Sequence, residues 1–170
     1  SAASDVYKRL FLESGDKIRL FFEEEAFDSE GDLVQSKEQS INKIGHALHD
    51  LDPLFERFSR KPALPGIVED LGFTNLFLFQ SMFIFKQPRS GGEVGYHQDG
   101  TFLFTDPISV TGFWFALEDA NQLNGCLWAI PGGHRNPLKS RFYRNVSGNG
   151  TEMEVWDDTC LLYTSPSPRD

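Results

Sequence analysis

The segment His97-Gln98-Asp99 places an imidazole and a carboxylate two positions apart. Alternate residues of a strand point to the same side of a sheet, so on a strand these two side chains should converge. An imidazole and a carboxylate are two of the three ligands in the facial triad that holds non-haem Fe(II) and leaves other positions open. The motif alone is short, and the simpler interpretation is an exposed His beside a turn Asp with no metal.

The elements that should position this pair are short strands separated by turns, with helices before them. We expect a strand within residues 17–22, a helix in the second half of residues 40–60 that begins at Asp52-Pro53, and a helix at 65–71 that ends at Gly72. Further strands are predicted at residues 76–86 (a central strand), 97–104, 109–118 and 126–130, after which the pattern fades. This order predicts a mainly β fold with flanking helices, an antiparallel jelly roll (double-stranded β-helix) that is incomplete at the C-terminus.

Residues 160–170 do not resemble the rest of the chain. Their eleven residues match, codon for codon, the in-frame translation of a transposase sequencing adaptor, and we interpret them as an assembly artefact. The alternative is a flexible tail rich in Ser and Pro. We therefore expect one partial domain at residues 1–159.

Composition narrows the classes of function. The net charge of −9 argues against nucleic acid as a partner, because binding phosphates requires an excess of Lys and Arg. No apolar run approaches the length of a membrane span, and no signal-peptide pattern opens the chain. Two Cys residues fit a reducing compartment, so a cytoplasmic location is expected. Sixteen Phe in short runs suit a β-rich core.

Several separated segments, in the same order, resemble the phytanoyl-CoA dioxygenase family. The resemblance runs from about Ser14 to about Arg144, and it includes SINKIGHALH at 40–49, QSMFIFKQP at 80–88, residues 91–94, the His97-Gln98-Asp99 motif, GFWFALEDA at 112–120 and NGCLWAIPGGHR at 124–135. It implies an Fe(II)- and 2-oxoglutarate-dependent dioxygenase with a small-molecule substrate, for which ascorbate is a candidate reductant.

The resemblance also assigns residues to roles. His97 and Asp99 correspond to the first two iron ligands, with no catalytic residue beyond the metal ligands. Residues that correspond to contacts with 2-oxoglutarate are Lys43, Met82, Gln98 and Trp114. The family's third ligand, a His, and the Arg that pairs with 2-oxoglutarate are expected after Thr159, so this chain by itself should bind Fe(II) weakly and turn over little. His134 is not the position of a ligand.

Other interpretations of these residues stay open. Lys43 could be a solvated helix lysine, and Met82 and Trp114 could belong to the core instead of lining a cavity shared with His97 and Asp99. His46 and His49 are interpreted as helix-face or core residues. The chain could also be a non-catalytic jelly-roll binding module, or a cupin-type metal enzyme that does not use 2-oxoglutarate. The substrate, including whether it is an acyl-CoA, and the oligomeric state are left open.

Overall fold

The computed structural model describes residues 9–23, 25–88, 91–92, 94–148 and 150–159, which form two compact units. The first unit extends to Gly92 and the second begins with the residues after it. Residues 160–170, interpreted above as an artefact, lie outside the described residues.

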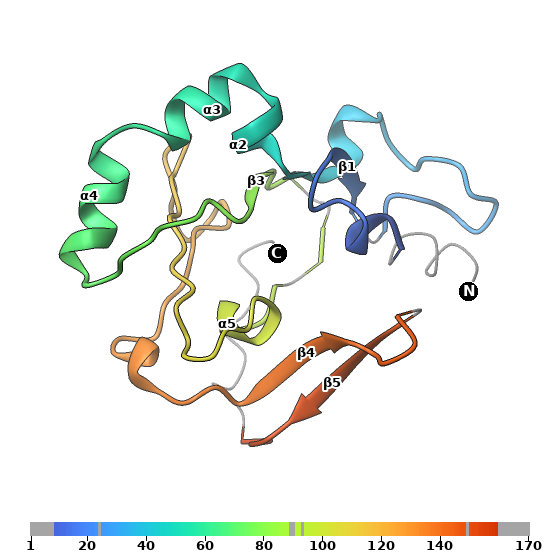
Figure 1. Ribbon diagram of the computed structural model, residues 1–170. Helices are drawn as coiled ribbons and strands as arrows, with labels where there is room; N and C mark the ends of the chain where they lie inside the picture. The colour runs from blue at the N-terminus through green and yellow to red at the C-terminus, as the bar shows by residue number, and fades with distance from the viewer. Residues whose placement is uncertain (1–8, 24, 89–90, 93, 149, 160–170) are drawn as a thin grey trace. The chain divides into compact units, whose positions relative to one another are not determined.

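A three-stranded antiparallel sheet forms the centre of the first unit (Figure 1). Its strands are β1 (Ile18–Phe22), β2 (Ile41–His46) and β3 (Ser81–Ile84), in the order β1-β2-β3. β-Branched and aromatic residues, which favour extended backbone, supply three of the five residues of β1 and two of the four residues of β3. The strand predicted at 17–22 is confirmed. The strand predicted at 76–86 is shorter than expected, and it lies at an edge, because β2 occupies the centre.

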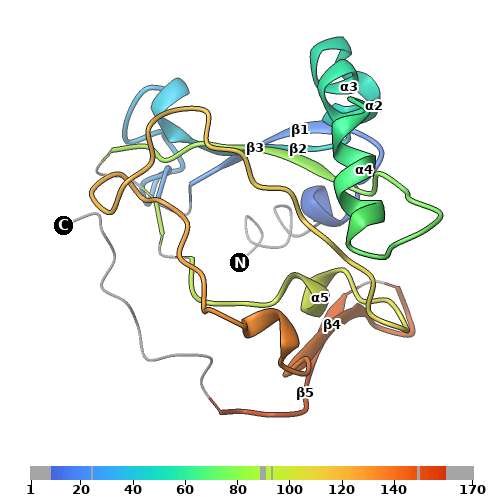
Figure 2. The same ribbon diagram turned by 90° about the vertical axis from the view of Figure 1, so that its left-hand side faces the viewer.

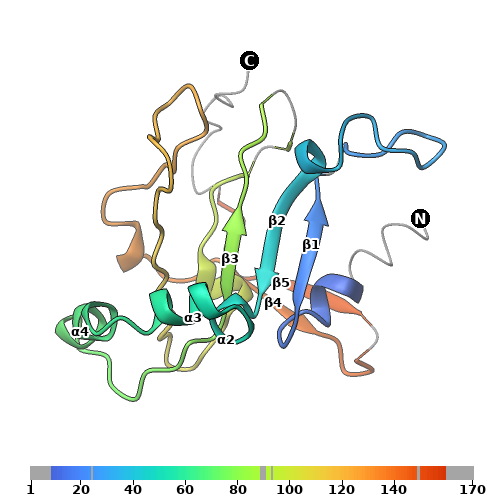
Figure 3. The same cartoon turned by 90° about the horizontal axis from the view of Figure 1, so that it is seen from above.

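Short helices follow β2 at one end of this sheet, as Figure 3 shows. They are α2 (Leu48–Leu51), α3 (Pro53–Ser59) and α4 (Ala63–Asp70), and a 3-10 turn, η1 (Glu38–Ser40), precedes β2. The predicted helix start at Asp52-Pro53 is confirmed, because Asp52 Oδ1 accepts hydrogen bonds from the backbone N–H groups of Leu54 (2.9 Å) and Phe55 (3.1 Å). The predicted stop at Gly72 is also confirmed, since its φ of 90° suits glycine.

The register of the sheet separates its two faces. Lys43 pairs with Phe21 and Ile84, and Gly45 pairs with Met82. Paired residues and alternate residues share a face, so Lys43 and Met82 lie on the same side of the sheet. Ile44 and its partner Phe83 face the other way, where the Phe83 ring lies 6.1 Å from the ring of Phe55 on α3. The core of this unit also holds buried polar side chains, namely Ser14, Glu23, Ser40, His46 and His49.

The second unit contains α5 (Asp99–Phe102), the 3-10 turn η2 (Gly133–Arg135) and a hairpin of β4 (Ser140–Arg144) and β5 (Thr151–Val155). Figure 2 shows α5 beside β4, and the rings of Phe102 and Phe142 lie 5.7 Å apart. This hairpin falls where the apolar pattern fades, so the sequence interpretation missed it.

Three of the predicted strands are wrong. Residues 97–104 turn into α5, where Leu103 N–H donates to Asp99 C=O (2.9 Å) and Thr101 N–H donates to Gln98 C=O (2.9 Å). Gly100 and Thr101 are buried, and a Cβ on Gly100 would lie 3.1 Å from Leu138 Cδ2, so packing with a distant residue favours the turn. Residues 109–118 and 126–130 are not assigned as strands. The described residues thus form two small antiparallel sheets with short helices. Among these residues, no helix is long and apolar enough to cross a bilayer.

Candidate metal and cosubstrate site

The side chains of His97 and Asp99 meet, although no strand carries them. His97 Nε2 lies 3.4 Å from Asp99 Oδ1. Gln98, between them, has an extended backbone, so the two side chains leave the chain on the same side, and Asp99 then opens α5. His97 Nδ1 lies 2.9 Å from the carbonyl oxygen of Gly95. A carbonyl can only accept, so Nδ1 carries a hydrogen, and Nε2 faces Asp99, to which it donates when the ring is protonated.

The pair is polarised as an ion pair would be. The hydrogen bond to Asp99 is the main cause that raises the pKa of His97, and the Gly95 carbonyl adds to it. The hydrogen bond from His97 is the main cause that lowers the pKa of Asp99. Burial opposes both changes, and the side chains are 45% and 63% exposed, so solvent reaches both of them. An accessible imidazole nitrogen beside a carboxylate is a donor set that suits Fe(II).

Gly112 leaves space for the Asp99 carboxylate. A Cβ on residue 112 would lie 3.3 Å from Asp99 Oδ2, which is tighter than ordinary van der Waals contact. The sequence interpretation did not identify Gly112 or the carbonyl of Gly95 as part of the site. A signal existed for Gly112, since a glycine inside an apolar run often marks a close approach. No signal existed for Gly95, because every residue has a backbone carbonyl.

Gln98 and Trp114 lie near the pair in the chain, and their surroundings differ. Gln98 Nε2 donates to Pro137 C=O (3.1 Å), and Gln98 Oε1 accepts from the Lys139 N–H (3.2 Å), so its amide links α5 to the start of β4. Trp114, two residues after Gly112, is 51% exposed. The contact of each with 2-oxoglutarate stays a prediction.

Lys43 and Met82 belong to the first unit, where they share a sheet face. Lys43 is on β2 and not on a helix, which corrects the alternative of a helix lysine. Its Nζ lies 5.5 Å from the centroid of the Phe11 ring and 6.0 Å from that of Phe21, and burial lowers the pKa of Lys43 while the charge of Glu23 opposes this. Since His97, Asp99 and Trp114 belong to the second unit, the cavity that Met82 was expected to share with these three residues stays a prediction.

The other three histidines, His46, His49 and His134, lie on other elements than the His97–Asp99 pair. His134 is exposed on η2. His46 ends β2 and is buried, which corrects its placement on a helix, and His49 is a buried residue of α2, as expected. Within the described part of the chain, no three His, Cys, Asp or Glu side chains are grouped as a metal site would require. The two donors present fit two of three ligand positions.

Comparison with known proteins places the chain in a family. The profile of the phytanoyl-CoA dioxygenase (PhyH) family matches residues 2–159, and the chain belongs to this family.

Individual relatives agree with that assignment. The chain is 54% identical to a phytanoyl-CoA dioxygenase of Arabidopsis thaliana over 138 residues, which cover 81% of this chain and 49% of the relative. It is 56% identical to phytanoyl-CoA dioxygenase 1 of Oryza sativa subsp. japonica over 135 residues, which cover 79% of this chain and 48% of the relative. It is 54% identical to phytanoyl-CoA dioxygenase domain-containing protein 1 of Danio rerio over 139 residues, which cover 81% of this chain and 48% of the relative. The chain thus spans about half the length of these curated relatives.

Proposed function

We propose that this chain carries part of an Fe(II)- and 2-oxoglutarate-dependent dioxygenase with a jelly-roll fold. The observation that carries the proposal is the approach of His97 Nε2 to Asp99 Oδ1 at 3.4 Å, while His97 Nδ1 is hydrogen-bonded to Gly95 C=O. A backbone carbonyl that fixes the ring and directs the other nitrogen outward is the usual support of a metal-binding His. Family membership supports the same proposal.

In this proposal His97 binds iron through Nε2 and Asp99 binds it through a carboxylate oxygen. When bound, Fe(II) together with 2-oxoglutarate would supply the oxidising chemistry, which side chains alone cannot perform. With a metal bound, Asp99 would contact it in place of the His97 ring, and the absence of a Cβ at Gly112 leaves the Asp99 carboxylate uncrowded. The third ligand is expected outside residues 1–159.

For the cosubstrate, Lys43 would attract a carboxylate of 2-oxoglutarate, because an ammonium that is partly withdrawn from water pairs with anions more strongly. Met82 and Trp114 would contact its carbon chain, since both expose apolar surface, at 43% and 51%. We also propose a small-molecule substrate and, from the Cys content, a cytoplasmic location.

Metal binding by this chain tests the site directly. Anaerobic titration with Fe(II), followed by calorimetry, is compared for the unchanged chain and for His97→Ala, Asp99→Ala and His134→Ala. Each of the first two substitutions removes a ligand and should weaken binding by at least about tenfold, whereas His134→Ala should not change it. Equal affinity in all four proteins would reject His97 and Asp99 as ligands.

Turnover tests the reaction. A longer protein that contains this sequence should release labelled CO₂ from 2-oxoglutarate with Fe(II) and ascorbate, and both ligand substitutions should abolish the release. The chain of residues 1–170 should release little, because it supplies two of the three expected ligands. A longer protein that binds Fe(II) and 2-oxoglutarate without turnover would instead support the non-catalytic binding module.

A further inference from the structure

A buried hydrogen bond joins the segment before β1 to the end of β2. Ser14 Oγ lies 2.6 Å from His46 Nδ1, and the two residues are 0% and 4% exposed. Ser14 Oγ also donates to Phe11 C=O at 2.6 Å. Since the single hydroxyl hydrogen is used there, His46 Nδ1–H donates to Ser14 Oγ. Whether the ring is neutral is then decided by the surroundings of Nε2.

The second nitrogen of His46 has no suitable place for a proton. His46 Nε2 is buried and has no hydrogen-bond partner among the described residues. The His46 ring lies 4.9 Å from the ring of Phe11 and 5.2 Å from that of Phe21, measured between centroids. A proton on Nε2 would create a buried charge without an acceptor, which is costly in such surroundings.

The same segment lies against Lys43. We call residues Arg9–Ser14 the strap. Besides the bond of Ser14, the strap is held by Phe11, whose ring contacts His46, Phe21 (5.7 Å) and the ammonium of Lys43 (5.5 Å). Arg9 and Glu13 are exposed. A short segment held by few buried groups opens more readily than the sheet on which it lies.

We propose that the strap is an acid-releasable cover of Lys43, latched by the hydrogen bond between Ser14 and neutral His46. Taking up a proton at Nε2 favours the form in which the strap has left and water reaches the ring. The consequence for 2-oxoglutarate rests on the role of Lys43 in the proposed function: with the strap in place, Phe11 shields one side of the ammonium from a dicarboxylate. The latch itself does not depend on that role.

The sign and size of the effect follow from the surroundings of His46. Burial first, and then the positive charge of Lys43, lower the pKa of His46 from 6.5 to about 4. Other charged groups on the strap, on β1 and on the residues that flank them are Arg9, Glu13, Asp16, Lys17, Arg19 and Glu23. The latched form stays neutral down to about pH 4, whereas a hydrated His46 takes a proton near 6.5. The equilibrium constant for release of the strap should therefore rise as the pH falls from 6.5 to about 4, by at most about 300-fold. Below about pH 4 it should rise no further.

Hydrogen exchange of the chain between pH 7 and pH 4, corrected for intrinsic rates, measures this release. The backbone N–H groups of Glu13, Ser14 and Lys17 donate hydrogen bonds to carbonyl groups of the strap. Their protection against exchange should fall with pH, by up to about 300-fold. In His46→Asn, an amide that cannot titrate in this range replaces the donor to Ser14 Oγ, and the pH dependence should disappear. Unchanged protection in the original chain would overturn the proposal. So would equal loss at Phe85 N–H, which donates to Asn42 C=O in the sheet, because acid would then unfold the whole unit.

Amine labelling at pH 8, read by mass spectrometry, tests the cover independently of titration. Ser14→Ala and Phe11→Ala should each increase the labelling rate of Lys43 several-fold. Lys61 is the matched control, since its Nζ lies 5.2 Å from the centroid of the Phe58 ring and away from the strap in the fold, and its rate should not change. An unchanged Lys43 rate in both variants would show that the strap is not a cover. Neither measurement uses iron or 2-oxoglutarate. The proposal for the strap can therefore be rejected while the proposed function stands, and the proposed function can be rejected while the strap is confirmed.

Discussion

Gly112 and Asp99 are matched in shape, because a Cβ on Gly112 would lie 3.3 Å from the Oδ2 atom of Asp99. Gly112→Ala should displace this carboxylate by a few tenths of an ångström without unfolding the unit, since Asp99 is largely exposed. We expect Fe(II) affinity to fall by about tenfold, as for other groups that support a metal ligand. Calorimetry measures it.

The matched control for that substitution is Gly66→Ala on α4, where a Cβ would meet nothing within 4 Å. This variant should keep the original affinity, and its helix should gain slightly in stability. If Gly112→Ala and Gly66→Ala bound Fe(II) equally well, the position of the Asp99 carboxylate would not matter for the metal.

Gln98 should contribute to the stability of the second unit before any ligand binds. Its amide makes hydrogen bonds with Pro137 C=O and Lys139 N–H, and each such bond contributes about 0.5–1.5 kcal/mol. Gln98→Ala should therefore lower the free energy of unfolding by about 1–2 kcal/mol in urea titrations without 2-oxoglutarate. Gln122→Ala, at an exposed position, is the comparison and should have little effect. A stability equal to that of the original chain would leave a ligand contact as the remaining role of Gln98.

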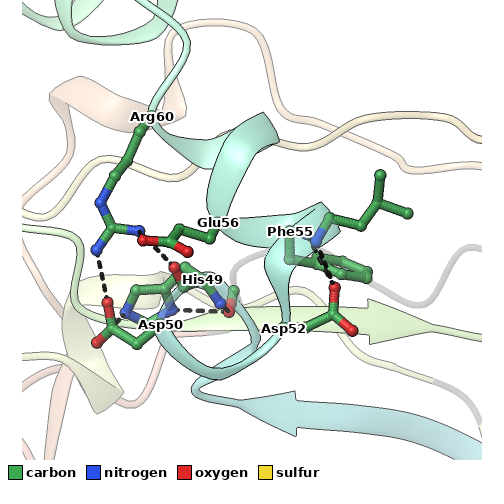
Figure 4. Close-up of polar contacts among 8 residues, drawn as sticks. His49, Asp50, Asp52, Phe55, Glu56 and Arg60 are labelled. Carbon is green, nitrogen blue, oxygen red and sulfur yellow. Dashed lines mark hydrogen bonds and ion pairs between the residues drawn. The ribbon is translucent and has the colours of Figure 1, made fainter.

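Asp52 should determine where α3 begins. Figure 4 shows its carboxylate at the backbone of the first turn, where it accepts from Leu54 and Phe55. Asp52→Ala should lower the free energy of unfolding by about 1 kcal/mol, whereas Asp52→Ser, which keeps an acceptor, should recover most of it. Thermal or urea unfolding measures both. Equal losses for Ala and Ser would contradict a capping role.

Asp157 should titrate far below an ordinary carboxyl. Hydrogen bonds from the Thr159 hydroxyl and from Lys139 Nζ are the main causes that lower the pKa of Asp157 from 3.8 to about 2. A lowered Asp pKa stabilises the folded form above pH 3.8, and this contribution is lost as the pH falls through about 2. Carboxyl NMR titration of Thr159→Val should show the pKa rising toward 3.8, while Thr159→Ser should keep it low. An unchanged pKa in Thr159→Val would assign the effect to Lys139 and to the backbone N–H of residue 159, which the substitution leaves in place.

Local signals in the sequence predicted the parts of the fold that short-range interactions decide. Asp52-Pro53 marks the start of α3, and Gly72 adopts the positive φ that ends the turn after α4. Residues 97–104 were predicted wrongly because Gly100 packs against Leu138, 38 positions away, and no local pattern contains that contact. The β4–β5 hairpin was missed because polar residues such as Arg141 and Glu154 pair across it instead of an apolar alternation.

The site shows the same division. The types and spacing of His97 and Asp99 were sufficient to single them out, even though the strand predicted at residues 97–104 was wrong. The strap could not be foreseen, since the bond between Ser14 and His46 joins residues 32 positions apart and follows only from the folded chain.

The register of β2 has a consequence for how this sequence can vary. Lys43 and Met82 lie on one face of the sheet, and Ile44 and Phe83 lie on the other. A slip of one residue between β2 and β3 would turn one strand over relative to the other, so that either Lys43 would face Phe55 or Phe83 would face the strap. Substitutions that weaken the ladder would thus disturb the proposed 2-oxoglutarate contacts of Lys43 and Met82 and the folding of the sheet together.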